Sequence, residues 1–133
     1  MKKFFVALMA VLVLASCGGK KETTPAEVMM MTVDVINVAT ENVENATTSD
    51  EVIDATAALY SEMKGLQTNY GDVMASVETL SEDEQEEMFS VEYEAMQNAI
   101  ARYSVAIISK MELMNDLTPE QERRWTELLE SEF

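Results

Sequence analysis

The side chains of this protein that could take part in chemistry are mainly carboxylates and hydroxyls. The sequence has 25 acidic residues, nine basic residues, no histidine and a single cysteine, Cys17. Without histidine the chain lacks the commonest general base and a usual ligand of zinc, and it cannot form Ser-His or Cys-His nucleophile pairs. We therefore expect no catalytic residue, no bound metal, no cofactor and no small-molecule substrate.

The largest group of such side chains is an acidic cluster in residues 82–94, where seven carboxylates occur without a basic residue between them. Carboxylates are favoured at the positive end of a helix dipole, so the cluster could simply be a solvated helix start. The alternatives are a docking surface for a basic partner or a weak Ca²⁺ site, although a calcium loop with its glycine is missing. The candidate docking residues are Glu82, Asp83, Glu84, Glu86, Glu87 and Met88.

The overall charge limits the possible partners. The formal net charge is −16 at pH 7, and the isoelectric point is about 4.1. Nucleic-acid recognition depends on basic residues that neutralise phosphates. We therefore expect no nucleic-acid partner.

Cys17 follows a segment with the layout of a secretory signal. Lys2 and Lys3 form a basic start, residues 4–14 are an unbroken apolar run, and small residues precede the cysteine. An apolar run of this length is too short to span a bilayer. Leu14-Ala15-Ser16-Cys17 resembles the lipobox of bacterial lipoproteins. The resemblance implies cleavage before Cys17 and a diacylglycerol on its sulfur; an ordinary signal peptide with a chance cysteine is the alternative.

The lipobox resemblance also implies a layout and an address. Residues 1–16 would be a cleaved signal peptide, 17–24 a lipidated tether and 25–133 a helical bundle. Gly18, directly after the cysteine, resembles the case in which lipoproteins are passed on to the outer membrane. We therefore expect a protein of the bacterial cell envelope, held at the outer membrane by its lipid. Which face of that membrane it occupies stays open.

Four boxes of the form Ser/Thr-x-x-Glu/Gln mark predicted helix starts. In such a box the hydroxyl accepts from the amide three residues on, and the acidic or amide side chain bonds back to the first N–H. The boxes begin at Thr24, Thr48, Ser81 and Thr118. They predict helices over residues 25–46, 49–79, 82–115 and 119–131. Residues 29–38 are rich in β-branched side chains, so a strand is the alternative within the first element.

The two middle helices carry apolar residues about every 3.5 positions. A chain reversal at Ser81 would place Leu59 opposite Tyr103 and Leu66 opposite Met96. The predicted fold class is all-α. We expect a long antiparallel αα-hairpin, covered at its base by the two other helices, in an up-down bundle of three to four helices.

The two outer helices are predicted to cover only one end of this hairpin. Folding back at Thr47 places Met29 opposite Leu66, and the last helix is expected to return along the end of the third. The tip of the hairpin, residues 71–93, would then project with its acidic cluster exposed. Its less well covered apolar residues would be Met74, Val77, Met88 and Phe89.

Three successive methionines, Met29, Met30 and Met31, cannot all face one core. At least one should be exposed or face a second surface. A flexible thioether patch there could form an adaptable binding site, although filling gaps in a core is the more common use of methionine.

Leu117-Thr118-Pro119-Glu120-Gln121 resembles the LTxxQ motif of small periplasmic stress chaperones, a family of extended antiparallel α-hairpins. Leu80-Ser81-Glu82-Asp83-Glu84-Gln85 is a looser version, with serine for threonine and glutamine one place late. The resemblance implies a protein that holds partly unfolded envelope proteins or senses metal.

The sequence as a whole predicts a non-enzymatic, lipid-anchored helical module that binds or scaffolds another envelope protein. One alternative is a periplasmic stress chaperone or sensor of the LTxxQ type. Another is an acidic inhibitor or immunity-type protein that uses the acidic cluster against a basic toxin or enzyme. An enzyme would need two close, desolvated acids in a cleft.

Overall fold

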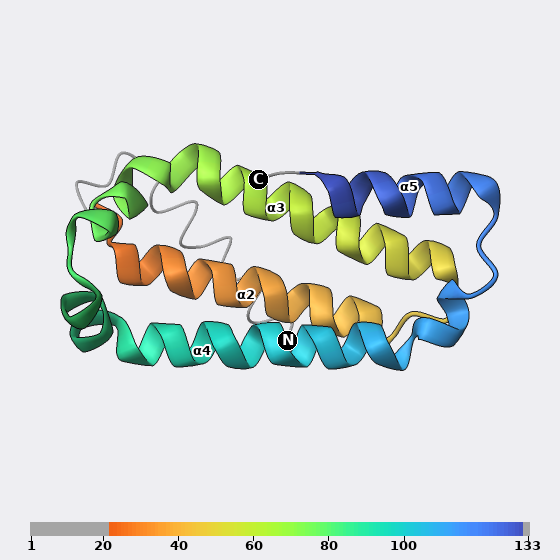
Figure 1. Cartoon of the computed structure of the whole chain (residues 1–133), viewed down its shortest axis with the longest axis horizontal. Coiled ribbons are helices and arrows are strands. Elements are labelled where there is room, and N and C mark those ends of the chain that lie inside the picture. Colours follow the sequence, from red (N-terminus) through yellow and green to blue (C-terminus); the bar gives the residue numbers. More distant parts are fainter. Residues whose placement is uncertain (1–21, 132–133) are drawn as a thin grey trace.

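The computed structural model describes residues 22–131, and it contains helices and no strand in that range. Its elements, shown in Figure 1, are α2 (Pro25–Glu44), α3 (Ser49–Ala75), η1 (Val77–Thr79), α4 (Glu82–Ser109), η2 (Met111–Met114) and α5 (Pro119–Glu130). The predicted all-α bundle is confirmed, and the β-branched residues 29–38 lie in a helix. The signal segment and Cys17 lie outside the described residues, so their predicted roles stay predictions.

All four predicted capping boxes are present. The hydroxyls of Thr24, Thr48, Ser81 and Thr118 each accept from the amide three residues on at 3.3 Å. In return, the side chains of Glu27, Glu51, Glu84 and Gln121 accept from the cap N–H groups at 2.8–3.2 Å. A cap of this kind typically stabilises a helix by about 1 kcal/mol. The four starts are therefore determined locally, by the capping residues themselves.

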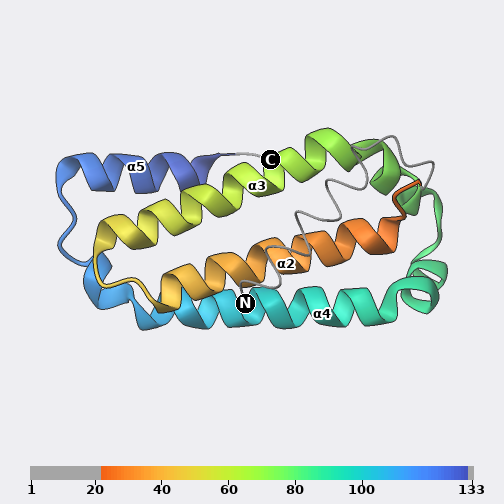
Figure 2. The ribbon, with the colours of Figure 1, turned by 180° about the vertical axis from the view of Figure 1, so that it is seen from behind.

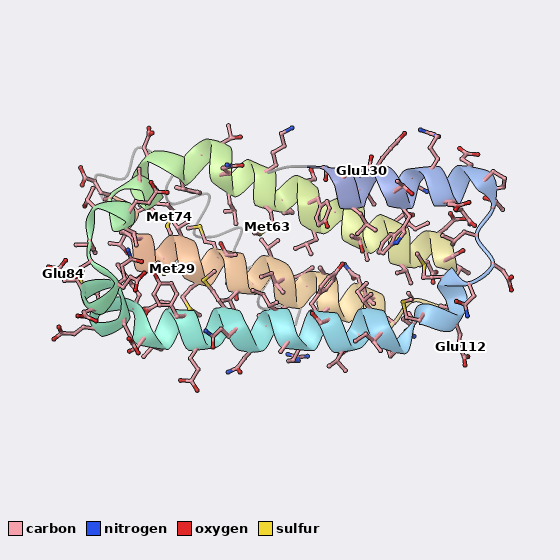
Figure 3. All side chains as sticks on the ribbon, in the orientation of Figure 1. Met29, Met63, Met74, Glu84, Glu112 and Glu130 are labelled. Atoms are coloured by element: carbon pink, nitrogen blue, oxygen red, sulfur yellow. The ribbon has the colours of Figure 1, made fainter. Side chains whose placement is uncertain are left out.

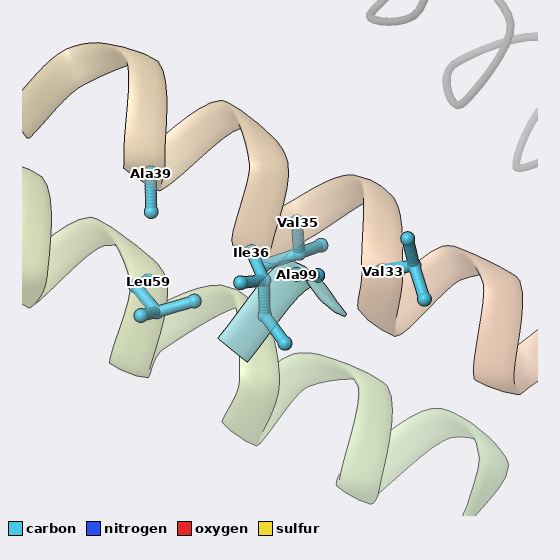
Figure 4. Close-up of a cluster of buried hydrophobic side chains, with 6 residues drawn as sticks. All are labelled: Val33, Val35, Ile36, Ala39, Leu59 and Ala99. Carbon is cyan, nitrogen blue, oxygen red and sulfur yellow. The ribbon is translucent and has the colours of Figure 1, made fainter. Parts of the chain in front are cut away.

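Helix α2 lies between α3 and α4 and packs against both along its length (Figures 1 and 2). Figure 4 shows the centre of this packing, where Val33, Val35, Ile36 and Ala39 of α2 form a buried cluster with Leu59 of α3 and Ala99 of α4. The alanines allow the helices to approach closely, and the branched side chains fill the space around them. The core of the bundle is thus built around α2.

Helices α3 and α4 meet through side chains. Leu59 belongs to the buried cluster around α2, and Leu66, Met96 and Tyr103 pack against it, so the residues of both predicted pairs share one cluster. One turn away, the hydroxyl groups of Thr56 and Tyr103 form a hydrogen bond of 2.7 Å. The two long helices therefore run in opposite directions, as expected, but α2 lies between their backbones, and they meet only where side chains reach past it.

The predicted arrangement needs a correction at the tip of the hairpin. Helix α2 reaches that end, where Met29 packs with Val77 and Phe89, so both of these residues are buried. Phe89 has non-helical dihedral angles, φ −126° and ψ 20°, and the first turns of α4 bend there across the end of the bundle (Figure 1). The bend places the Phe89 side chain against Met29. Among the four predicted tip residues, Met88 is the strongly exposed one, at 61%.

The position of α5 is a second correction. Helix α5 packs against the beginning of α3 and not along the end of α4. Arg124 links the two helices: its guanidinium lies 2.7 Å from Asp54 Oδ1 and 3.7 Å from Asp50 Oδ1, both on α3. The short helix η2 carries the chain around the end of the bundle to reach that side (Figure 1).

None of the helices within residues 22–131 has the length and apolar character needed to cross a membrane.

Candidate functional site

The predicted docking residues lie at one end of the bundle, which η1 and the first turns of α4 form. We call residues 77–94 the acidic end. All six predicted docking residues, Glu82, Asp83, Glu84, Glu86, Glu87 and Met88, are exposed there. Glu84 has a structural task, because its carboxylate accepts from the Ser81 N–H at 2.8 Å, and this hydrogen bond lowers the pKa of Glu84. The acidic end is therefore partly a helix cap and partly free surface.

A shallow hollow of about 380 Å³ divides the predicted docking residues into two groups. Glu82 and Glu86 line it together with Glu94, whereas Asp83, Glu84, Glu87 and Met88 are not among its lining residues. Its other lining residues, which sequence reasoning missed, are Gln85, Ser90, Tyr93 and Gln97. All of its lining residues belong to α4 and lie on both sides of the bend at Phe89.

Gln85 holds this hollow in place. Its side-chain amide donates to the carbonyl oxygens of Val77 and Leu80, both at 3.1 Å. Its oxygen accepts from the Tyr93 hydroxyl at 3.1 Å. Gln85 thus ties η1 and the turn after it to both sides of the bend in α4, so the carboxylates of Glu82 and Glu86 stand on a fixed backbone.

The acidic end does not form a preformed metal site. Among the described residues, no three histidine, cysteine, aspartate or glutamate side chains converge closely enough to hold an ion. Burial raises the pKa of Asp34, but Asp34 lies on α2 and lines neither this hollow nor the cavity described next.

A second hollow, of about 190 Å³, lies between α2, α3 and α4. Four methionines from these three helices share its lining: Met29, Met63, Met74 and Met96. The other lining residues are Val28, Thr32, Leu66, Gln67, Tyr70 and Gly71. Met29, Met63 and Met74 lie in the half of the bundle next to the acidic end (Figure 3). We call this hollow the methionine cavity.

Few free polar groups face the methionine cavity. The Thr32 hydroxyl already donates to the Val28 carbonyl at 3.0 Å, and Met29 is fully buried. Thioether side chains are flexible and polarizable, so such a lining adapts to the shape of an apolar group. The prediction that one of the three successive methionines is exposed is confirmed by Met30, which is 39% exposed, whereas Met29 serves the core and the cavity.

The two hollows are neighbours. Tyr93 lines the acidic hollow, Met74 and Met96 line the methionine cavity, and all three pack against the same cluster of Met29, Val77 and Phe89. The sequence analysis did not predict this cavity, although its predicted chain reversals already brought some of the lining residues together. The two predicted reversals placed Leu66 opposite both Met29 and Met96, and all three residues line it.

The fold and these surfaces define an all-α helical bundle with an acidic end and an adjacent apolar cavity. Comparison of the chain with protein-family models, with curated proteins and with solved structures finds no match.

Proposed function

We propose that this protein is a lipid-anchored, non-enzymatic helical module of the bacterial cell envelope that binds another protein. The lipid anchor is supported by the resemblance of Leu14-Ala15-Ser16-Cys17 to a lipobox. The binding role is supported above all by one observation, the methionine cavity beside the acidic end. The outer membrane is the proposed address because Gly18 follows the cysteine.

The size and lining of the cavity suit one large apolar side chain. An apolar cavity of about 150 Å³ holds a benzene molecule, and the methionine cavity has about 190 Å³. Removing a leucine or phenylalanine side chain from water contributes roughly 1.5–3 kcal/mol. A single inserted side chain would therefore provide a substantial part of the affinity for a short segment of a partner.

The acidic hollow adds a second requirement for the partner. Glu82, Glu86 and Glu94 line it, and basic side chains are scarce in this protein. Complementary charge mainly speeds association and fixes orientation. We therefore propose a partner segment that carries an exposed leucine or aromatic side chain beside lysine or arginine residues.

The LTxxQ resemblance lends this proposal no separate support. Thr118 accepts from the Gln121 amide, and Gln121 accepts from the Thr118 N–H at 2.9 Å, so the two characteristic side chains serve as a helix cap. An inhibitor of a basic toxin or enzyme would use the same acidic end, and identification of the captured partner distinguishes that case.

Gly71 allows a direct test of the cavity. Gly71 lines it, and a Cβ atom added at Gly71 or at Gly65 on the same helix meets no atom within 4 Å. Both replacements by leucine should raise helix stability by about 1 kcal/mol. We expect Gly71→Leu to block the cavity and Gly65→Leu to leave it open, so Gly65→Leu is the matched control.

The measurement is photo-crosslinking in intact cells from a photoreactive residue in place of Gln67, which is exposed and lines the cavity. A specific adduct should form in the Gly65→Leu background and disappear in the Gly71→Leu background. Charge reversal of Glu82, Glu86 and Glu94 should weaken the adduct more than reversal of Glu120, Glu122 and Glu130 on α5, which changes the net charge equally. An adduct that persists with Gly71→Leu would exclude the cavity as the binding site.

The anchor is tested separately by mass spectrometry of the mature protein. The expected product begins at Cys17 and carries a diacylglycerol on its sulfur. An unmodified Cys17, or a mature chain that begins elsewhere, would reject the anchor and leave the cavity experiment unaffected.

A further inference from the structure

The outer side of α4 carries a row of exposed apolar residues. Val91, Val105 and Ile108 are 72%, 66% and 67% exposed, which makes them the most exposed large hydrophobic residues in the described part of the chain. Val91 precedes Asn98 by seven residues and Val105 follows it by seven, so Val91, Asn98 and Val105 form one stripe along the helix. We call Val91, Asn98 and Val105 the outer stripe. It lies to one side of Ala99 and Ala106, which are buried in the bundle, about a quarter of a turn around the helix.

The charges of α4 are divided along the same helix. Seven acids and no base occur in residues 82–94, whereas residues 95–111 contain no acid and two bases, Arg102 and Lys110. Glu94 and Arg102 lie four residues on either side of Asn98. Arg102 is available for a new partner, because its contact to Glu44 is 3.9 Å long and its side chain is 57% exposed.

This pattern fits a second copy of the same helix running in the opposite direction. We infer that two molecules associate through the outer stripe, with α4 of each copy antiparallel to α4 of the other and crossing near Asn98. Val91 of one copy then lies beside Val105 of its partner, and Glu94 lies beside Arg102. A two-fold axis makes each of these contacts twice, so apolar meets apolar and acid meets base on both sides of the axis.

Two features favour a second copy over other occupants. A chain with a net charge of −16 repels its own copies. Residues 95–111, which include Asn98 and Val105 of the outer stripe, contain no acid and offer a place where two copies can approach. The straight part of α4 after the bend at Phe89 provides about 30 Å of helix, enough for several turns of contact. The contact shares Glu94 with the acidic hollow but uses neither the methionine cavity nor the lipid. It depends on residues of α4 alone, so it does not rest on the proposed function.

Charge exchange on the full-length protein tests this pairing. Glu94→Arg and Arg102→Glu should each weaken dimerisation at least about tenfold in sedimentation equilibrium, because each brings like charges together. The double variant with both changes should restore it, since the two charges then meet again across the axis. Within one molecule the two residues are eight positions apart on α4, too far for a direct pair to explain the rescue. Arg123→Glu on exposed α5 is the control and should leave dimerisation unchanged.

Val105→Asp supplies an independent variant, because it places a charge in the stripe at an exposed position that the fold does not need. It should abolish the dimer and leave the helical circular dichroism signal unchanged. A photoreactive residue at Asn98 should yield an adduct of two copies of this chain, because that position faces itself across the axis. A monomer at about 1 mM, where a contact of roughly 4 kcal/mol is half formed, would overturn the inference. A dimer unaffected by these substitutions, or an adduct only with lipid or another protein, would overturn it as well.

Discussion

The hydrogen bond between Thr56 and Tyr103 gives a direct test of how α3 meets α4. The two hydroxyl oxygens are 2.7 Å apart, 47 positions apart in sequence, and this bond joins the two long helices at the level of the core. Thr56 is only 2% exposed, whereas Tyr103 is half-buried. Partial burial raises the pKa of Tyr103.

Tyr103→Phe removes the partner of a buried hydroxyl. Leaving such a group without a hydrogen bond costs about 1–3 kcal/mol of the free energy of unfolding. The lower figure applies if Thr56 turns its hydroxyl to the carbonyl of Val52, four residues earlier in the helix. Thr56→Val should cost less, because half-buried Tyr103 can turn its own hydroxyl to water. Replacing both residues removes donor and acceptor together, so the double variant should lose less than the sum of the two single losses.

The assay is urea unfolding of the wild type, both single variants and the double variant, followed by circular dichroism. A coupling of about 1 kcal/mol or more between the two positions is expected from a hydrogen bond of this kind. Thr68→Val on the same helix is a control, because Thr68 is exposed and its hydroxyl donates only to the Lys64 carbonyl. A Tyr103→Phe variant as stable as the wild type, together with no coupling, would refute the proposed contact between α3 and α4.

Two further changes test the electrostatics and the capping of the bundle. Burial raises the pKa of the Asp34 carboxyl in the folded state above its value in the unfolded chain. The charged carboxylate therefore destabilises the fold at pH values above the folded-state pKa. This destabilisation disappears at pH values below the unfolded-state pKa, where the carboxyl is protonated in both states. Asp34→Asn should therefore raise the unfolding free energy at about pH 7 and leave it unchanged at about pH 2, which urea titrations at both pH values check. Ser81→Ala removes the cap of α4 and should lower the thermal midpoint through a loss of about 0.5–2 kcal/mol; an unchanged midpoint would show that Gln85 alone holds the start of α4.

The helix starts could be predicted from the sequence because each is determined by a few neighbouring residues, whereas the helix ends were predicted less well. Helix α3 ends at Ala75, where 79 was expected, and the Ser76 hydroxyl donates to the Val73 carbonyl at 2.7 Å as the chain tightens into η1. Helix α4 ends at Ser109, where 115 was expected, and the Ser109 hydroxyl donates to the Ala106 carbonyl at 2.6 Å. Both predicted helices continue through these serines, although a serine hydroxyl that bonds to a nearby carbonyl competes with the hydrogen bonds of the helix.

The sequence also indicated the central position of α2, through the β-branched run in residues 29–38 that made a strand the alternative. Val33, Val35 and Ile36 point to different sides of a helix and are all buried. A helix that is apolar on more than one side is one that packs against more than one neighbour. The β-branched run thus indicated a helix between two others. The predicted chain reversals could not show that α2 lies between two helices, because each reversal pairs only two helices and the one at Thr47 placed α2 against α3 alone.

The acidic end was predicted by residue type but not by shape. The division between Glu82 and Glu86 inside the hollow and Glu87 and Met88 outside it depends on the bend at Phe89. No proline or glycine marks this bend in the sequence. It accompanies the burial of Phe89 against Met29 and Val77, a contact between three elements that no local pattern describes.

Helix α4 connects the two surfaces proposed for this protein, and its geometry allows both to be occupied at once. Met96 lines the methionine cavity, and Asn98 lies at the centre of the outer stripe two residues later. Side chains two positions apart on a helix point to nearly opposite sides. An antiparallel dimer would therefore leave both methionine cavities open to partners, whereas Glu94, which lines the acidic hollow, would be engaged by Arg102 of the other copy. Two linked sites raise the apparent affinity for a partner that is itself repeated or crowded on a membrane. Val105→Asp should accordingly weaken capture of such a partner while leaving the binding of a single isolated segment unchanged, whereas Gly71→Leu should abolish both.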